Sequence, residues 1–275
     1  MRDLDTPIEV SLSPDQKKVA FVTNADNALW LLDLGNPVPT RLTFFAVLQA
    51  GALYGLSWSP DSRRIAYALE AGTIHDVIHV IETESSRDTA IFTAPGLFAP
   101  PGGWSADGHS LIASCTDTSG TDLWSIPVDR PGPAAAYART SADEGAARLS
   151  PDGKWIASFA AQDGKGTIQI LSWPHPGQRY QLTLDFELGF TQTVWSEDGR
   201  SLLFADARGR MIVVPVQFEG GFRQGEPRVL FTLGPWQRWA GASPDFRRFL
   251  LLEAEPLSNP APLRVLTSWP ARLRQ

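Results

Sequence analysis

The sequence repeats one short motif six times at an almost constant spacing. Each copy starts with serine, has aspartate two residues later and continues into an apolar run, and successive copies start 45 to 47 residues apart. A period of about 40–50 residues is typical of four-stranded β-propeller blades. We therefore expect an all-β fold, a six-bladed β-propeller with four-stranded antiparallel blades. The motif serines are Ser13, Ser59, Ser105, Ser150, Ser196 and Ser243.

The motif is typical of a tight turn between the first two strands of a blade. In the copy that starts at Ser150, proline fixes φ, aspartate bonds to the local backbone and glycine accepts a positive φ. Glycine is replaced by Gln16, Ser62 and Phe246 in three copies, so we expect these three turns to be looser. Serine and aspartate occur in all six copies, and we interpret them as turn residues.

The repeat predicts one domain across all 275 residues. The last copy ends shortly after its third strand. We therefore expect residues 1–5 to supply its outer strand, which would close the ring and leave no open edge. The expected blades are residues 8–45, 52–94, 100–140, 145–184, 191–233 and 238–269.

Composition excludes several classes of partner. The net charge is −6, so no basic field attracts nucleic acid. No apolar run reaches the ~20 residues of a membrane span, and the first residues lack a signal-peptide pattern. The single cysteine, Cys115, has no partner for an internal disulfide. These features predict a soluble monomer without membrane insertion and leave its compartment open.

The residues that most often perform chemistry do not form a catalytic or metal-binding pattern. His75 and His79 are four residues apart on an expected strand, which separates them by ~13 Å. His109 occupies a repeat position that carries lysine or arginine in the other copies. No Gly-x-Ser-x-Gly sequence marks a nucleophile. We assign no catalytic residue, metal or cofactor.

Aromatic residues concentrate in the connections between blades, outside the repeat pattern. Loops at one end of a propeller converge around its channel, so these residues are candidates for binding a protein or peptide partner. The alternative is that the rings fill gaps between blades. The candidate residues are Phe44, Phe45, Tyr54, Phe98, Phe186, Phe190, Trp236, Arg238 and Trp239.

The strings WSPDSRRIAYA and LSPDGKWIASF resemble the WD-like propeller repeats of the bacterial TolB family. The second half, with VWSEDGRSLLFAD and MIVVPVQFEGGFRQGEPRVLF, is similar to the C-terminal propeller of certain bacterial membrane-tethered serine/threonine kinases. Those propellers commonly end in Asn-Trp, whereas this chain has Ser268-Trp269. The resemblance implies recognition or sensing through protein contact. No kinase motif is present, so any kinase activity would lie outside this sequence.

Two functions follow from these observations. The first is a non-catalytic scaffold or sensor that binds a protein or peptide on its loop face, as part of a bacterial signalling protein. The second is a propeller domain of, or associated with, a glycan lyase or peptidase. A cluster of histidine, acidic or basic residues at the channel mouth would distinguish them, because propellers host both binders and enzymes.

Overall fold

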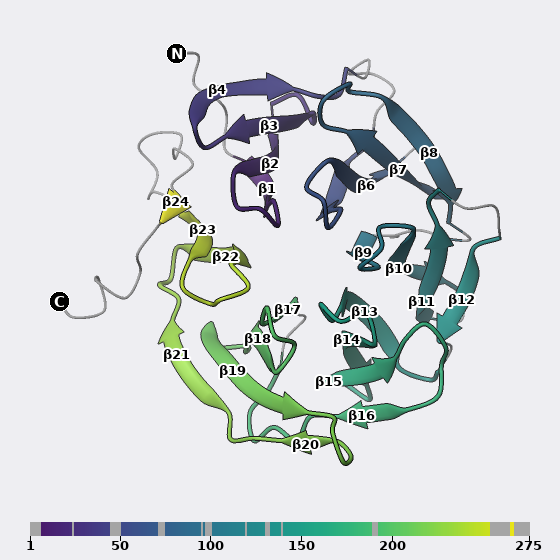
Figure 1. Cartoon of the computed structure of the whole chain (residues 1–275), viewed down its shortest axis with the longest axis vertical. Coiled ribbons are helices and arrows are strands. Elements are labelled where there is room, and N and C mark those ends of the chain that lie inside the picture. Colours follow the sequence, from purple (N-terminus) through teal and green to yellow (C-terminus); the bar gives the residue numbers. More distant parts are fainter. Residues whose placement is uncertain are drawn as a thin grey trace. The chain divides into compact units, whose positions relative to one another are not determined.

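The structure is a computed structural model of the chain. Its described residues form 24 strands and no helix (Figure 1). The strands make six antiparallel sheets, which divide between two compact units. None of the described segments forms a helix with the length and apolar composition of a membrane span. The described residues are 7–23, 25–44, 51–70, 75–94, 96, 101–118, 120–129, 133–138, 140–188, 192–253 and 265–266.

Unit 1 comprises residues 1–101, 235–243 and 247–275 and contains three sheets. The first sheet of the chain, β1–β4, lies between the other two. Val10 and Phe21 on one of its faces pack with Leu250 of the last sheet. The strands are β1 (Pro7–Leu12), β2 (Lys18–Thr23), β3 (Leu29–Asp33), β4 (Asn36–Arg41), β5 (Leu53–Trp58), β6 (Arg64–Glu70), β7 (Asp76–Glu82), β8 (Asp88–Thr93), β22 (Gln237–Ala242), β23 (Phe249–Glu253) and β24 (Val265–Leu266).

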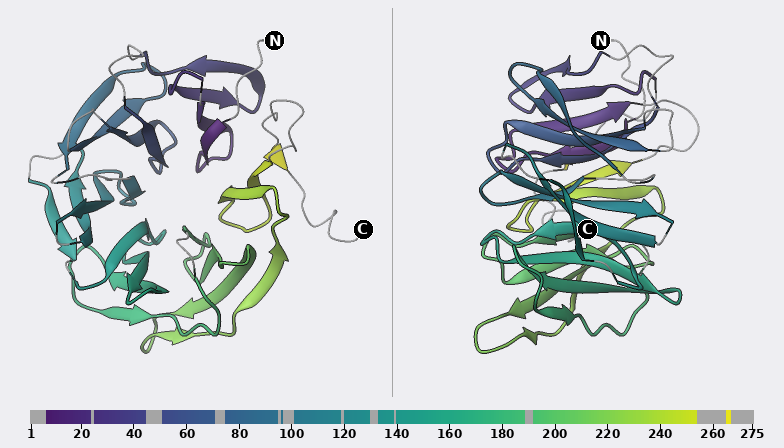
Figure 2. Two further views of the ribbon diagram at one scale, coloured as in Figure 1. Left: turned by 180° about the vertical axis from the view of Figure 1, so that it is seen from behind. Right: turned by 90° about the vertical axis from the view of Figure 1, so that its right-hand side faces the viewer.

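Unit 2 comprises residues 102–234 and 244–246 and contains the other three sheets. Its middle sheet, β13–β16, packs on both neighbours, as the teal and green blades of Figure 2 show. The strands are β9 (Pro101–Trp104), β10 (Ser110–Asp117), β11 (Gly120–Pro127), β12 (Ala135–Ala138), β13 (Asp143–Leu149), β14 (Trp155–Gln162), β15 (Lys165–Ser172), β16 (Arg179–Gln181), β17 (Thr193–Trp195), β18 (Ser201–Ala205), β19 (Arg210–Gln217), β20 (Arg223–Gln224) and β21 (Arg228–Thr232).

Five of the six sheets have at least the four strands of the predicted blade. Four sheets have four strands, and the sheet of β17–β21 has five because the long strand β19 pairs with both β20 and β21. The sheet of β22, β23 and β24 has three strands within the described residues. The structure therefore shows five complete blades, not the six predicted. The predicted closing strand, residues 1–5, lies outside the described residues.

The six motif turns share one geometry. The motif serine donates to the motif aspartate at 2.6 or 2.7 Å in five of them. In all six, the serine hydroxyl accepts an N–H from the residue five positions later. The fourth residue has φ between 55° and 71° whether or not it is glycine. The expectation of three looser turns is therefore wrong, because these bonds fix Gln16, Ser62 and Phe246 in the left-handed region at about 1 kcal/mol each.

The second strands hold the core. In β2, the five residues after Lys18 are buried, so both faces of the strand are covered. Indole groups also connect neighbouring sheets: Trp58 donates to the Ser11 carbonyl at 3.1 Å, and Trp195 donates to the Arg148 carbonyl at 3.0 Å. Trp58 and Trp195, each of which directly precedes a motif serine, therefore pack between blades.

Antiparallel pairing decides which connections share an end of each sheet. The loop after the second strand and the segment after the outermost strand lie at the same end, and the Ser-x-Asp turn lies at the other. We call the first of these the loop end. The candidate residues Phe44 and Phe186 follow the outermost strands β4 and β16, so both lie at the loop end of their sheets.

Candidate functional site

The structure separates the nine sequence candidates by exposure. Phe44 and Trp236 are 74% and 59% exposed, and Arg238 is also exposed. Tyr54, Phe186 and Trp239 are half-buried. Phe45, Phe98 and Phe190 lie outside the described residues.

The connection that contains Trp236 is shorter than the sequence indicated. Arg238 and Trp239 belong to β22, where they pair with Leu252 and Leu251 of β23. The Trp239 indole nitrogen is buried and has no hydrogen-bond partner among the described residues. Backbone pairing fixes Trp239 in the sheet, so its side chain has a packing role, whereas Trp236 in the preceding turn presents its ring to solvent.

Tyr54 has a structural bond of its own. It lies in β5, and its hydroxyl donates to the carboxylate of Asp76 at the start of β7. This contact joins the first and third strands of one sheet at its loop end. The half-buried ring and the committed hydroxyl leave Tyr54 less suited to bind a partner than Phe44.

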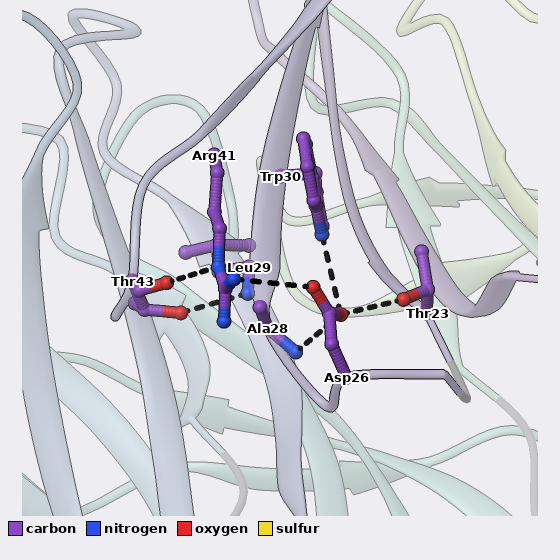
Figure 3. A network of polar contacts seen from close by, with 7 residues as sticks. All are labelled: Thr23, Asp26, Ala28, Leu29, Trp30, Arg41 and Thr43. Carbon is purple, nitrogen blue, oxygen red and sulfur yellow. Dashed lines mark hydrogen bonds and ion pairs between the residues drawn. The ribbon is translucent and has the colours of Figure 1, made fainter. Parts of the chain in front are cut away.

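The Phe44 ring packs on Arg41, and Arg41 is itself held by Thr43 and Asp26 (Figure 3 shows these two contacts). The Arg41 guanidinium carbon lies 5.3 Å from the Phe44 ring centre and 6.0 Å from that of Trp30. Arg41 Nε donates to the Thr43 carbonyl at 2.8 Å, and Arg41 Nη1 lies 3.7 Å from the Asp26 carboxylate. Both contacts limit the rotamers of Arg41. We call Asp26, Arg41 and Phe44 the Phe44 platform.

Asp26 is the anchor of this platform. Its Oδ1 accepts hydrogen bonds from the Thr23 hydroxyl at 2.7 Å, the Ala28 amide at 3.1 Å and the Trp30 indole at 3.3 Å (Figure 3). Burial alone would raise the pKa of Asp26, but these bonds and the charge of Arg41 together lower it. Asp26 is therefore charged at neutral pH and holds the loop between β2 and β3.

A second group in unit 2 uses the same residue types. Asp206 follows β18 and accepts N–H bonds from Arg208 at 2.9 Å and Arg210 at 2.8 Å. Its other carboxylate oxygen accepts Arg210 Nε at 2.6 Å, and the Arg210 guanidinium lies 5.4 Å from the Phe186 ring centre. Burial opposes ionisation, yet the bonds from Arg210 and Arg208 lower the pKa of Asp206. We call Asp206, Arg210 and Phe186 the Phe186 wall.

Phe186 lines two hollows of about 660 Å³ each. Both are lined by Thr183, Leu184 and Phe186, so they adjoin along residues 183–186, which we call the ridge. One hollow, which we call the acidic hollow, is also lined by Asp185, Glu226 and Arg210. Asp206 neutralises the charge of Arg210. The other hollow, which we call the basic hollow, is also lined by Lys165, Arg179 and Asp163. Their size is within the usual range for ligand sites.

A buried carboxylate lies beside the basic hollow. Glu144 is fully buried, and its Oε1 accepts the Thr140 hydroxyl at 2.6 Å and lies 3.9 Å from Arg179. Its Oε2 has no hydrogen-bond partner among the described residues. Burial raises the pKa of Glu144; Thr140, Gln169 and Arg179 offset this only in part, and the charge of Asp122 adds to it.

One further group contains residue types that are common in active sites. The Asp88 carboxylate accepts the Tyr67 hydroxyl at 2.7 Å and lies 3.2 Å from His79 Nδ1, and the two rings stack. Tyr67 is fully buried, so its hydroxyl does not reach solvent. Burial and Asp88 raise the pKa of Tyr67. Within the described chain, no three His, Cys, Asp or Glu side chains are placed to hold a metal ion.

Solved structures share this architecture. TolB from Acinetobacter baumannii aligns with a TM-score of 0.64 and 18% identity over 83% of this chain and 55% of its own. A putative TolB from Agrobacterium tumefaciens gives 0.65 and 20% identity over 83% and 82%. The fold is a β-propeller similar to that of these TolB structures. An oligogalacturonate lyase from Vibrio parahaemolyticus gives 0.62 and 11% identity over 90% and 74%. This chain spans about half the length of the Acinetobacter TolB.

Sequence comparisons add no family assignment. No family model matches the chain. No curated protein matches it by sequence either. The structural likeness therefore establishes the propeller fold, and the site must be argued from this propeller's own residues.

Phe44 and Phe186 were among the residues predicted from the sequence, but the residues that hold their rings in place were not. Asp26, Arg41, Asp206 and Arg210 carry no repeat signature, because they lie where the copies differ. One signal was available: an aspartate within three residues of the end of the second strand in the blades that contain β2 and β18. The hollows had no such signal, since each is lined by one sheet together with residues 183–186 of the connection after β16.

Proposed function

We propose that this propeller is a non-catalytic scaffold or sensor that binds a protein or peptide partner at its loop end. The observation that carries the proposal is the Phe44 platform. An aromatic ring that is 74% exposed lies over an arginine already fixed by an aspartate and a carbonyl. Aromatic residues and arginine dominate the binding energy of protein interfaces, and a fixed side chain loses little entropy on binding.

Trp236 extends this surface chemistry within unit 1. It is 59% exposed in the turn before β22. An exposed tryptophan lowers the solubility of a protein, and tryptophan is common at the centres of interfaces. We place Phe44 and Trp236 in the partner-binding surface and assign Trp239 to packing.

The test is capture of partners by the purified, tagged chain from extracts of the organism that encodes it. We expect Phe44→Ala combined with Trp236→Ala to abolish recovery of a partner that the wild-type chain retains. With that partner in hand, its Kd for the double variant should rise at least about tenfold, as for loss of interface anchors.

The matched control replaces two other exposed apolar residues, Leu34 and Val38, by alanine. Leu34 is 40% exposed and lies just before β4, and Val38 is 68% exposed and lies within β4; both are away from its loop end. The control should bind like the wild type. Equal recovery by the Phe44/Trp236 variant and the control would contradict the proposal.

The fold similarity to an oligogalacturonate lyase supports a second candidate, a propeller of or associated with a glycan lyase. Incubation of the pure chain with oligogalacturonate, followed by ultraviolet absorbance of unsaturated products, separates the two functions. Product formation would replace the scaffold proposal by the lyase.

We also propose that residues 1–5 complete the sheet of β22, β23 and β24 as a sixth blade. The supporting observation is that β1 lies beside β22 and that Val10 packs with Leu250, so the first and last sheets of the chain are neighbours in unit 1. Deletion of residues 1–5 should lower the melting temperature markedly. An unchanged melting temperature would exclude this closure.

In a longer protein, such a propeller would act as the sensor end of a signalling chain.

A further inference from the structure

The paired hollows of unit 2 form a second surface with a charge pattern of its own. The acidic hollow presents Asp185 and Glu226, and Arg210, the one cation among its described lining residues, is paired at 2.6 Å with Asp206. The basic hollow presents Lys165 and Arg179 against Asp163, and Arg179 lies 3.9 Å from the buried Glu144. The side chains that line the two hollows therefore carry opposite net charges, and in each hollow an arginine lies beside a buried carboxylate that is not among the lining residues.

The ridge between the hollows is held rigidly. The Gln224 side-chain amide accepts the Thr183 N–H and donates to the Thr183 carbonyl, both at 2.8 Å. Farther along, the Ala207 amide donates to the Glu187 carbonyl at 3.2 Å. The Gln224 side chain thus bonds both backbone groups of Thr183, at the start of the ridge, as a neighbouring strand would. A ligand that binds here meets a prepared surface and does not have to order it.

Apolar groups connect the two charged hollows. Leu184 and Phe186 line both, and Ile212 and Val229 line the acidic hollow. Phe186 packs on the core of unit 2 and lies 6.4 Å from Phe204 between ring centres, so its position is fixed. The hollows can therefore take the alkyl part of a long charged side chain while its charged end meets a carboxylate.

We propose that the paired hollows bind an extended peptide that places a basic side chain in the acidic hollow and an acidic side chain in the basic hollow, with an apolar residue over the ridge. Charge complementarity selects this occupant. An acidic saccharide chain would meet Asp185 and Glu226 as like charges, and a basic one would meet Lys165 and Arg179.

The test is selection from a random peptide library displayed on phage against the full chain. Enriched sequences should contain Lys or Arg on one side of an apolar residue and Asp or Glu on the other. A synthetic peptide of the enriched sequence should bind the wild type, measured by fluorescence anisotropy. Binding should weaken at least about tenfold with Asp185→Lys combined with Glu226→Lys, or with Lys165→Glu.

Compensating changes make the result specific. A peptide whose basic residue is replaced by Glu should recover binding to the Asp185→Lys/Glu226→Lys chain. Glu219→Lys and Lys154→Glu alter exposed charges that line neither hollow, and both should bind like the wild type. Lack of enrichment, or binding that these reversals leave unchanged, would overturn the inference.

The surface is distinct from the Phe44 platform. The Phe44→Ala/Trp236→Ala chain should bind the selected peptide with unchanged Kd. Loss of partner capture by that chain with intact peptide binding would show two separate surfaces. Loss of peptide binding in that chain would contradict the assignment of the peptide to the hollows.

Discussion

The Phe44 platform and the Phe186 wall are built from the same three residue types, yet they present different surfaces. In the platform, arginine and phenylalanine are three residues apart on one connection, and the Asp26 side chain is 24% exposed. In the wall, Phe186 belongs to the connection before β17, and the Asp206 side chain is 1% exposed. The platform holds its ring out to solvent, whereas the wall packs its ring against the core.

The difference teaches what each acid contributes. A carboxylate near the surface orients its arginine but contributes little stability, because water competes for the same bonds. A buried carboxylate with three donors stabilises the fold, because removing it leaves those donors unpaired. The same chemistry is therefore expected to serve binding in unit 1 and stability in unit 2.

Replacement of Asp206 should have the largest effect on this comparison. Asp206→Asn should lower the free energy of unfolding by about 2–3 kcal/mol, because the Arg210 and Arg208 bonds lose a charged acceptor. Asp26→Asn should cost about 1 kcal/mol, since Asp26 is partly solvated. Urea denaturation at neutral pH measures both.

Acid should remove the Asp206 difference. Its lowered folded-state pKa means that its contribution is present above the ordinary value of 3.8 and lost as pH falls through the folded-state pKa. The wild type and Asp206→Asn should therefore converge in stability at low pH. Equal losses for the Asp206 and Asp26 variants at neutral pH would refute the distinction between the two groups.

The phenylalanines should differ next. Phe186→Ala removes a ring packed on the core of unit 2 and should cost about 1–2 kcal/mol. Phe44→Ala removes a ring that is 74% exposed and should change stability by less than about 0.5 kcal/mol. Thermal melts of both variants check this, and a reversed order would show that Phe44 is a packing residue.

Glu144 extends the comparison of the acidic residues, because it is a buried carboxylate whose Oε2 lacks a hydrogen-bond donor among the described residues. Its raised folded-state pKa means that the folded chain binds its proton more tightly than the unfolded chain does. Its effect on stability should therefore be most favourable at low pH and decline as pH rises above the ordinary value of 4.5. This slope has the opposite sign to that of Asp206.

Glu144→Gln removes the ionisation and nearly preserves the shape of the side chain. The unfolding free energy of the variant, relative to the wild type, should rise with pH above 4.5. Urea denaturation across a pH series measures the slope. A parallel pH dependence in the two chains would mean that Glu144 is ionised at no cost in the native fold.

Much of the fold was predictable because its signals are local. The Ser-x-Asp turn depends on bonds between residues at most five positions apart, and six copies gave the sheet boundaries. Predictions failed where a distant partner decided the outcome. Trp239 was placed in a connection, but pairing with Leu251 draws it into β22.

The candidate site was less predictable than the fold. The concentration of aromatics in the connections identified Phe44, Phe186 and Trp236, because such residues break the repeat. It did not separate exposed rings from packed ones. Exposure depends on what the neighbouring sheet places against each ring, and composition carries no information about that neighbour.

The repeat by itself determined an all-β chain of stacked four-stranded sheets, since each copy encodes its own turn and its own buried strand. Only the tertiary structure decided where a surface can bind. Asp206, Arg210 and Phe186 meet because the connection after β16 packs against the sheet of β17–β21, and each hollow lies between that connection and one sheet. Local hydrogen bonds depend on residues that are close in sequence, whereas the shape of a hollow depends on how segments distant in sequence pack together.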